Sequence, residues 1–409
     1  MTTIDISASP VTSSPTARAG MAPVSKFNAY EAFDQWATRP ADQRFRTLED
    51  LQAKLNARRV RSRGVEIPLH RIDVKPSISG GLIVNGGISG TAPTHWSFGQ
   101  LCSRVGVPSG FLRDRLKDRP DLASANLNHC IMNASAESLK WLMIEPEDSQ
   151  PLDAPSTLQA VTSATYGRIW DADVCEAVGR LRERSGGRFH NPKAWAPGHF
   201  GNKELAIPGG LYASDRDVFI FMIDGGSQLE GGDARSQELH RGFIVKNSEV
   251  GSATFTLTTF LFNSICGNHI VWGGRDVNQI AIRHTSGGPA RFDREAFPAL
   301  MSYADRSHSE EEAVLKKAGQ MLLPEKREDI AELVGKVGKF SNRELDYAIH
   351  AAKMEEGECR TLWQLVQGFT AHARSIEYMD ARVELETRAG KLLGLADKAL
   401  AGAGAIINV

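Results

Sequence analysis

The chain has 409 residues, enough to bury one large core or two modest ones. Its 48 Lys and Arg residues nearly balance its 49 Asp and Glu residues, so overall charge does not draw the molecule to nucleic acid or to a membrane, and any such affinity must come from local patches. No apolar run approaches bilayer-crossing length, and the first residues, MTTIDISASP, lack the basic and apolar regions of a secretory signal. We therefore expect a cytoplasmic protein that does not enter a membrane.

The cysteines are scattered and odd in number, which argues against a disulfide framework and is typical of a reducing compartment. They are Cys102, Cys130, Cys175, Cys266 and Cys359. Cys266 and His269 form a C-x-x-H pair, but no second pair at zinc spacing lies nearby, and a buried structural cysteine is the favoured interpretation. We expect neither a metal nor a cofactor.

Residues 1–25 consist mainly of Ser, Thr, Pro and Ala, too few large apolar groups to offset ordering entropy, so we expect a disordered tail. Residues 26–120 are expected to form a helical N-terminal region, with a short helix after Asn28 and a second from Leu48 to Arg61. Between Arg44 and Lys75, nine basic residues face only four acidic ones. This density indicates either a phosphate-binding surface or a solvated helix end with ion pairs between domains.

Residues 97–117 predict two helices joined by a tight turn at Gly106. Inward-facing side chains are expected at Leu101, Cys102, Val105, Phe111, Leu112 and Leu116. If the hairpin were a DNA-reading helix-turn-helix, Arg113, Arg115 and Lys117 would meet the DNA. Two helices packed in an ordinary core are the commoner arrangement.

Residues 121–290 are expected to form an α+β core domain. Strands are predicted at 127–132, 139–144 and 158–161, with a surface loop at 145–155, followed by a helix from Asp171 to Arg184. A buried strand is predicted at 218–223, a mobile glycine-rich loop at 225–232 and a last strand at 277–284. The glycines lack the spacing of a phosphate-binding loop.

Alternating residues at 253–261 predict a strand with one buried face, and polar residues lie at the strand ends on either side. These residues are Asn247, Ser248, Glu249 and Asn268, accompanied by Gly251 and Gly267. Local turn chemistry is favoured for them over catalysis, because Asn and Ser satisfy backbone groups and Gly permits positive φ. No nucleophile or carboxylate constellation predicts a catalytic site.

Several segments between about residues 95 and 285 carry a resemblance to a known family. They are Phe98-Gly99-Gln100-Leu101 running into Gly106-Val107-Pro108, Ala160-Val161-Thr162-Ser163 with Tyr166, Asn247-Ser248-Glu249-Val250-Gly251, and Cys266-Gly267-Asn268 followed by a Trp. In these segments the chain resembles a family of phage- and plasmid-borne proteins with a domain of unknown function, family 932. The resemblance implies a mobile-element context and supplies no catalytic residues.

Residues 291–409 predict a helical C-terminal subdomain, since capping boxes occur at Ser341 with Glu344 and at Thr361 with Gln364. Helices of this kind often pack between subunits, so a homo-oligomer is expected. The predicted architecture is α+β: a central, mostly antiparallel twisted sheet packed against helices, with a helical C-terminal extension.

The leading functional hypothesis is a mobile-element DNA-handling accessory protein, such as a recombination or annealing factor, that binds single strands through basic residues and exposed aromatic rings. The candidate nucleic-acid contacts are Arg58, Arg59, Arg61, Arg63, Arg71, Lys75, Arg113, Arg115, Arg168 and Arg188. The candidate stacking residues are Trp96, Tyr166, Trp170, Trp195 and Phe200, and for each of them a buried position in the core is the favoured alternative. The alternative is a module directed at a host protein, for example an inhibitor of a restriction or defence enzyme. Basic residues gathered along one groove would favour the first hypothesis, and scattered ones the second.

Overall fold

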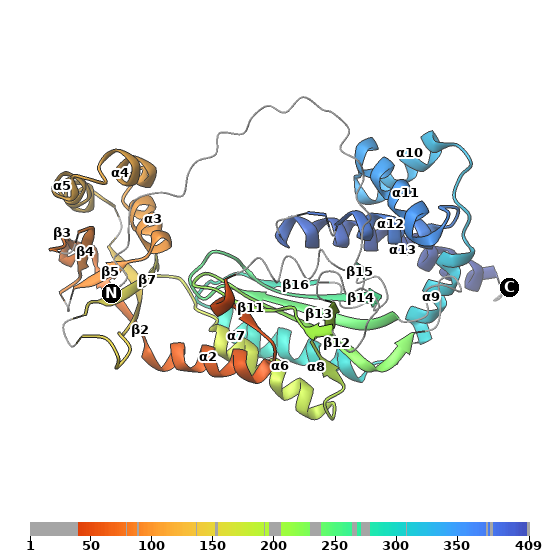
Figure 1. Ribbon diagram of the computed structural model, residues 1–409, viewed down its shortest axis with the longest axis horizontal. Coiled ribbons are helices and arrows are strands. Elements are labelled where there is room, and N and C mark those ends of the chain that lie inside the picture. The colour runs from red at the N-terminus through yellow and green to blue at the C-terminus, as the bar shows by residue number, and fades with distance from the viewer. Residues whose placement is uncertain are drawn as a thin grey trace.

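The computed structural model describes residues 40–78, 80–87, 90–135, 137–151, 154–191, 193–195, 206–229, 239–263, 268–270, 279–307, 309–373, 375–376 and 379–406. The tail expected at 1–25 and the helix expected after Asn28 lie outside these residues. Mainly antiparallel strands packed against helices make up most of the described chain, and its last part is helical (Figure 1). The predicted α+β architecture with a helical C-terminal extension is confirmed.

The larger sheet forms the centre of the molecule (Figure 1). Its strands follow the order β1-β11-β12-β13-β14-β15, with β8 beside β12 and β16 beside β14. They are β1 (Arg44–Phe45), β8 (Phe189–His190), β11 (Leu211–Ala213), β12 (Val218–Leu229), β13 (Leu239–Asn247), β14 (Phe255–Asn263), β15 (Asn268–Ile270) and β16 (Gln279–Ile282), while β9 (Lys193–Trp195) and β10 (Ala206–Pro208) pair separately. The strands predicted at 218–223 and within 253–261 are confirmed as parts of β12 and β14. Of the strand predicted at 277–284, residues 279–282 form β16, residues 277–278 lie outside the described residues, and residues 283–284 are not in a strand.

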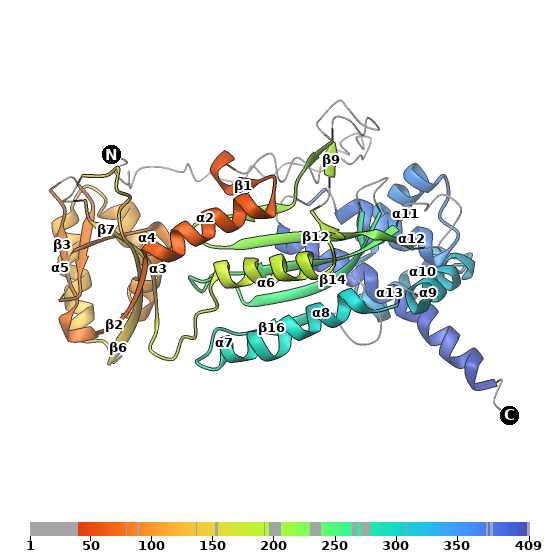
Figure 2. The same ribbon diagram turned by 90° about the horizontal axis from the view of Figure 1, so that it is seen from below.

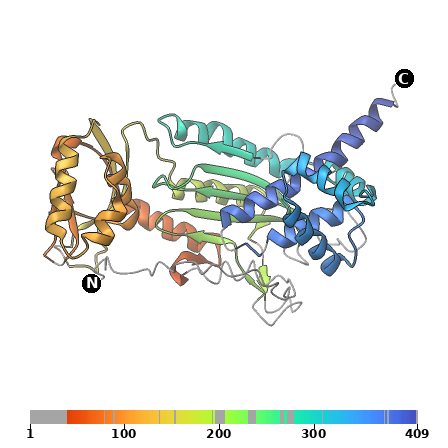
Figure 3. The same cartoon turned by 90° about the horizontal axis from the view of Figure 1, so that it is seen from above.

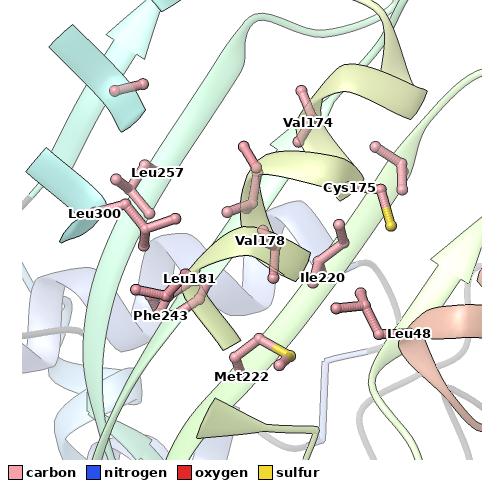
Figure 4. Close-up of a cluster of buried hydrophobic side chains, with 14 of the residues drawn as sticks. Leu48, Val174, Cys175, Val178, Leu181, Ile220, Met222, Phe243, Leu257 and Leu300 are labelled. Atoms are coloured by element: carbon pink, nitrogen blue, oxygen red, sulfur yellow. The ribbon is translucent and has the colours of Figure 1, made fainter. Parts of the chain in front are cut away.

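Helices α2 (Leu48–Arg61), α6 (Asp171–Arg184) and α8 (Phe297–Asp305) cover one face of this sheet (Figures 1 and 2). Helix α6 presents Val174, Val178 and Leu181 at helical spacing, and they join Phe243 and Leu257 of the sheet in one buried cluster (Figure 4). A short helix, α7 (Gly288–Arg291), and a π-helical turn, η4 (Phe292–Ala296), lead into α8. The helices predicted from Leu48 to Arg61 and from Asp171 to Arg184 are confirmed with the same bounds.

Residues 62–163 form a second unit with its own sheet, in the strand order β2-β6-β7-β5-β4-β3. Its elements are β2 (Ser62–Pro68), η2 (Leu69–Arg71), β3 (Asp73–Pro76), β4 (Leu82–Asn85), β5 (Thr91–Pro93), α3 (His95–Arg104), α4 (Ser109–Arg115), α5 (Pro120–Met132), β6 (Ser138–Ile144) and β7 (Ser156–Ser163). Strand β5 pairs parallel to β7, and the other pairs are antiparallel. The domain boundary expected between residues 120 and 121 falls inside this unit.

The strand predicted at Leu127–Met132 is wrong, because these residues end helix α5. Ala123, Leu127 and Ile131 recur every four residues and are all buried, so the apolar run reflects one face of a helix. The strands predicted at 139–144 and 158–161 are confirmed as β6 and β7.

The sequence pattern does not predict β2 and β3, which lie in the arginine-rich segment and form the two edges of the second sheet. Arg63 and Lys75 are exposed on these strands. Charged side chains on edge strands oppose pairing with other chains, and they also conceal the apolar alternation by which strands are recognised. The basic segment is therefore partly strand.

The helical hairpin predicted at 97–117 is confirmed as α3 and α4, with Gly106 at a φ of 75° in the turn. Leu101 and Cys102 are fully buried, as expected. Phe111 is a correction, since 52% of it is exposed and Leu112 occupies the inward position.

The loop predicted at 225–232 is wrong in its first part, because β12 continues to Leu229 with a register shift between Ile223 and Gln228. A Cβ on Gly225 would lie 2.4 Å from the His190 ring, and one on Gly226 would lie 2.4 Å from Arg188. These glycines therefore allow two side chains to cross the strand. Gly231 and Gly232 lie outside the described residues.

The C-terminal helices lie at the opposite end of the large sheet from the second unit (Figures 1 and 3). They are α9 (Ser309–Gln320), α10 (Arg327–Gly338), α11 (Asn342–Glu356), α12 (Leu362–Ala373) and α13 (Met379–Ile406). Leu229, Leu239 and Leu261 of the sheet belong to their apolar cluster, so the helices pack onto the strand ends. Both predicted capping boxes are confirmed. No helix within the described ranges is long and apolar enough to span a bilayer.

Candidate functional site

The turn between β13 and β14 connects the two sheets. Its Val250 carbonyl accepts hydrogen bonds from Trp96 Nε1 at 3.2 Å and from Gln100 Nε2 at 2.8 Å, both on α3. The Tyr166 hydroxyl donates to the Ser248 carbonyl at 3.2 Å. Gly251 has a φ of 81°, which only glycine adopts readily. The Asn247–Gly251 segment therefore forms a turn, as expected from the sequence, and its carbonyl groups also accept hydrogen bonds from Tyr166 and from side chains of α3.

A buried charged network lies directly beneath this turn. The Arg58 guanidinium reaches Asp171 at 2.7 Å and Glu249 at 3.0 Å. Asn247 Nδ2 donates to the other Asp171 oxygen at 2.7 Å, and the Asp171 backbone N–H donates to Glu249 Oε2 at 3.1 Å. The network thus joins α2, the first residue of α6 and the end of β13.

In this network two carboxylates share the Arg58 guanidinium, and Arg168 contributes a second positive charge beside them. Burial, together with the Glu249 charge, raises the pKa of Asp171 to about 7. Burial disfavours the cationic form of Arg58, but the Glu249 and Asp171 carboxylates outweigh it and raise the pKa of Arg58. The arrangement can take up a proton at Asp171 while Arg58 remains charged.

Arginines and aromatic rings alternate at the edge of this network. The Arg59 guanidinium lies 3.5 Å from the centre of the Trp170 ring, and Arg168 lies 5.4 Å from both Trp170 and Tyr166. Tyr166 in turn stacks on His284, with ring centres 5.1 Å apart and planes 6° from parallel. Such contacts between guanidinium groups and rings are favourable and leave the other face of the guanidinium free to bind.

A second arginine–tryptophan pair lies at the same junction, where Arg216 is 5.5 Å from the Trp96 ring centre. Both Trp96 and Trp170 pack against the buried cluster of Leu142, Ala160 and Val250. We call the set Arg59, Trp170, Arg168, Tyr166, Trp96 and Arg216 the arginine–aromatic strip.

Further positive charge gathers beside Trp96. Arg113 donates to the His95 carbonyl at 2.6 Å. Burial, followed by the charges of Arg113 and Arg216, lowers the pKa of His95. Arg113 from the second unit and Arg216 from the large sheet therefore act on the same imidazole, while Asp215, 4.0 Å from Arg216, partly offsets them.

The predicted nucleic-acid contacts divide into two groups. Arg58, Arg59, Arg113 and Arg168 are brought together at the junction. Arg58 is committed to carboxylates, and Arg168 donates to the Glu249 carbonyl. The others do not join them: Arg61 pairs with Glu147, Lys75 with Asp73 and Arg188 with Asp224, while Arg63, Arg71 and Arg115 are exposed on the second unit. Arg188 contributes instead to a second buried cluster.

That second cluster lies where the large sheet meets the C-terminal helices. Asp224 of β12 pairs with Arg188 at 3.0 Å and with Arg241 of β13 at 3.7 Å. The Arg241 guanidinium lies 5.1 Å from the Tyr303 ring centre and, within the described chain, makes no hydrogen bond. Charged residues inside buried strands were the sequence signal for this cluster, which the sequence interpretation overlooks apart from Arg188.

Other expected site residues contribute little to the junction. Cys266 and Phe200 lie outside the described residues, and Asn268 begins β15 opposite Asn263. Asp171 and Arg216 were missed by sequence reasoning, because an acid at a helix start and an arginine in a turn are ordinary surface features. Only the fold brings them to the junction.

Among the described residues, no three His, Cys, Asp or Glu side chains gather as they would around a metal ion. Comparisons with protein-family models, with curated proteins and with solved structures gave no match to this chain. Function is therefore inferred from the geometry of the junction.

Proposed function

We propose that the protein handles nucleic acid and binds single strands through the arginine–aromatic strip. Bases stack on aromatic rings and on guanidinium planes, while phosphates take the remaining guanidinium donors. The strip offers both kinds of group side by side, in the pairs Arg59 with Trp170 and Arg216 with Trp96.

The observation that carries the proposal is the state of Arg59. Its guanidinium stacks on Trp170 at 3.5 Å, and it makes no ion pair or hydrogen bond with any described residue. The neighbouring Arg58, by contrast, is held by two carboxylates. Stacking fixes the Arg59 plane without using its donors, which is a suitable arrangement for a phosphate or a base edge.

Single strands are favoured over duplex because the helical hairpin is poorly equipped to read a groove. Arg113 turns back to the His95 carbonyl and lies 5.2 Å from the Phe98 ring centre. Of the three cations predicted to meet DNA, Arg115 on α4 and Lys117 just after it are exposed. The mobile-element context, and a role in recombination or annealing, are proposed from the family resemblance.

The test is fluorescence anisotropy of labelled single- and double-stranded oligonucleotides across a salt titration. We expect the protein to bind single strands more tightly than duplex. In the Arg59→Ala/Arg216→Ala variant, the slope of log K against log salt should be smaller by about 1.4, since each lost phosphate contact removes about 0.7. The matched control is Arg63→Ala/Arg71→Ala, which removes two exposed arginines away from the strip and should leave the slope nearly unchanged. Equal losses in both variants would indicate diffuse charge attraction and contradict a site at the strip.

A module directed at a host protein is the second candidate, and the scatter of Arg63, Arg71, Lys75 and Arg115 favours it. Absence of binding to either oligonucleotide at low salt would contradict the nucleic-acid proposal and support this alternative. Proteins of the host's restriction and defence systems would then be tested for binding.

A further inference from the structure

We propose that residues 62–163 form a hinged module that undocks from the large sheet as a folded body, with the Asn247–Gly251 turn as its latch. This inference concerns the junction itself and holds whichever ligand the arginine–aromatic strip binds. Three features of the structure support it: the chain crossings, the separate cores and the make-up of the interface.

The module is joined to the rest of the chain at two places. The chain enters where helix α2 ends at Arg61 and β2 begins at Ser62, and it leaves through residues 164–170, between β7 and α6. Figure 1 shows the module at one end of the large sheet, and Figure 3 shows the same arrangement from above. The registers of β2 and β7 with β6 place the two crossings at opposite ends of these strands, so together they define a single axis about which the module can rotate.

The two cores are separate. The core of the module includes Leu101, Leu127 and Trp141, and no residue of it belongs to the cluster beneath the large sheet. Among the described helices and strands, the pairs that pack most extensively against each other also belong to the same unit. Each body therefore keeps its own buried apolar surface when the junction opens, which is the condition for movement without unfolding.

The interface between them is small and polar in character. Its apolar part is the cluster of Leu142, Ala160 and Val250, with two tryptophans against it. At the Val250 turn and at Asp215 its hydrogen bonds run from module side chains to main-chain carbonyls: Trp96 and Gln100 donate to Val250, and Gln159 donates to Asp215 at 2.6 Å. Beside the α2 crossing, the Glu145 N–H donates to the Arg61 carbonyl at 2.9 Å. Water can replace such donors and acceptors, so their loss costs a modest net free energy. Opening also exposes the small apolar cluster to water, which adds a hydrophobic cost.

Undocking would change which groups are exposed to solvent at the junction. The Val250 carbonyl and the cluster face of Trp96 would meet solvent, and Trp96 would move away from Arg216, because Trp96 lies on the module while Arg216 lies on the large sheet. Docking therefore controls whether the arginine–aromatic strip is continuous.

Thiol labelling tests the proposal, because the chain already contains reporters of unfolding. Cys102 is fully buried in the module core, and Cys175 is fully buried under the large sheet. Ala160→Cys adds a third thiol at a fully buried position of the interface. The labelling rate of each thiol is followed by peptide mass spectrometry and divided by its rate in denaturant, which removes differences in intrinsic reactivity.

We expect the thiol introduced by Ala160→Cys to react well before Cys102 and Cys175. Adding Trp96→Phe and Gln159→Leu removes two donors to the large sheet and should accelerate interface labelling about tenfold, with Cys102 unchanged. A second interface variant, Leu142→Cys, repeats the measurement if Ala160→Cys does not fold. If the interface thiol and Cys102 react in step, the interface opens only by unfolding and the proposal is overturned. If adding Trp96→Phe and Gln159→Leu does not change the labelling rate of the interface thiol, the proposal is also overturned.

Discussion

At the scale of residues, the decisive feature is that one cation holds two buried carboxylates. The sequence interpretation identifies Asn247, Ser248 and Glu249 as the notable polar residues, and all three are buried. Their partners Arg58 and Asp171 come from helices far away in the sequence. No local pattern could reveal the network, because both helices were predicted but their packing on one end of the sheet was not.

Asp171 gives this network a testable pH dependence. Burial and the Glu249 charge raise the pKa of Asp171 to about 7, so in the folded state the carboxyl holds its proton to higher pH than in the unfolded chain. The associated stability is fully present below about pH 4, the unfolded pKa, and is lost as pH rises to about 7. We expect the unfolding free energy of the native protein to fall relative to Asp171→Asn by about 1–4 kcal/mol across this window. Urea unfolding of both proteins between pH 4 and pH 8 measures the difference.

His284 changes the pH dependence of stability in the opposite direction, so its contribution must cancel when the two proteins are compared. Burial lowers the pKa of His284 to about 4, so its contribution is present above the unfolded value of about 6.5 and is lost as pH falls. Both proteins retain His284, and their difference isolates Asp171. A difference that stays constant from pH 4 to pH 8 would contradict the raised pKa of Asp171.

At the scale of elements, helix α12 is buried on nearly every side, and its single glycine permits this. A Cβ on Gly368 would lie 2.1 Å from the Ala348 carbonyl oxygen of helix α11. Backbone cannot move aside as a flexible side chain can, so glycine allows the close approach of the two helices.

We expect Gly368→Ala to destabilise the protein by about 2 kcal/mol or more, because the added methyl forces α11 and α12 apart. Gly394 in helix α13 is the matched control, since a Cβ there meets nothing within 4 Å. Gly394→Ala should stabilise by up to about 1 kcal/mol through helix propensity alone. Chemical denaturation of the two variants measures both changes, and a Gly368→Ala variant as stable as Gly394→Ala would contradict the close packing.

Sequence patterns predict elements well where one rule dominates. Helices α2 and α6 have the predicted bounds because apolar spacing, a starting residue and a stop agree. The pattern fails at Leu127–Met132, where a short apolar run suits a strand and a helix equally well, and at β2 and β3, where edge charges hide the alternation. In β14 the alternation ends at Leu257, since the residues from Leu257 to Leu261 are all buried.

At the scale of the whole molecule, the sequence did not predict that residues 62–163 form a separate body between α2 and α6. Contacts such as Gln159 to Asp215 join residues that local periodicity treats independently. The same holds at the far end, where Asp224, Arg188 and Arg241 link the large sheet to the region of Tyr303 and the C-terminal helices. Two polar clusters, one at each end, therefore connect the sheet to its neighbours.

In the buried cluster at the far end, removing the anion and removing a cation are expected to change the free energy of unfolding by different amounts. Asp224 is fully buried and is the paired anion of both arginines, whereas Arg241 is buried with no hydrogen bond in the described chain. Asp224→Asn leaves Arg241 as an unpaired buried cation and should cost about 3 kcal/mol or more.

Arg241→Met removes that cation, and should cost less than Asp224→Asn by itself. In the double variant it should restore much of the stability lost, because Arg188 is 34% exposed and can be solvated. A double-mutant cycle by urea unfolding measures the coupling. If the double variant is less stable than Asp224→Asn alone, Arg241 stabilises the sheet through packing against Tyr303 rather than through its charge, and the electrostatic account of this end of the molecule is wrong.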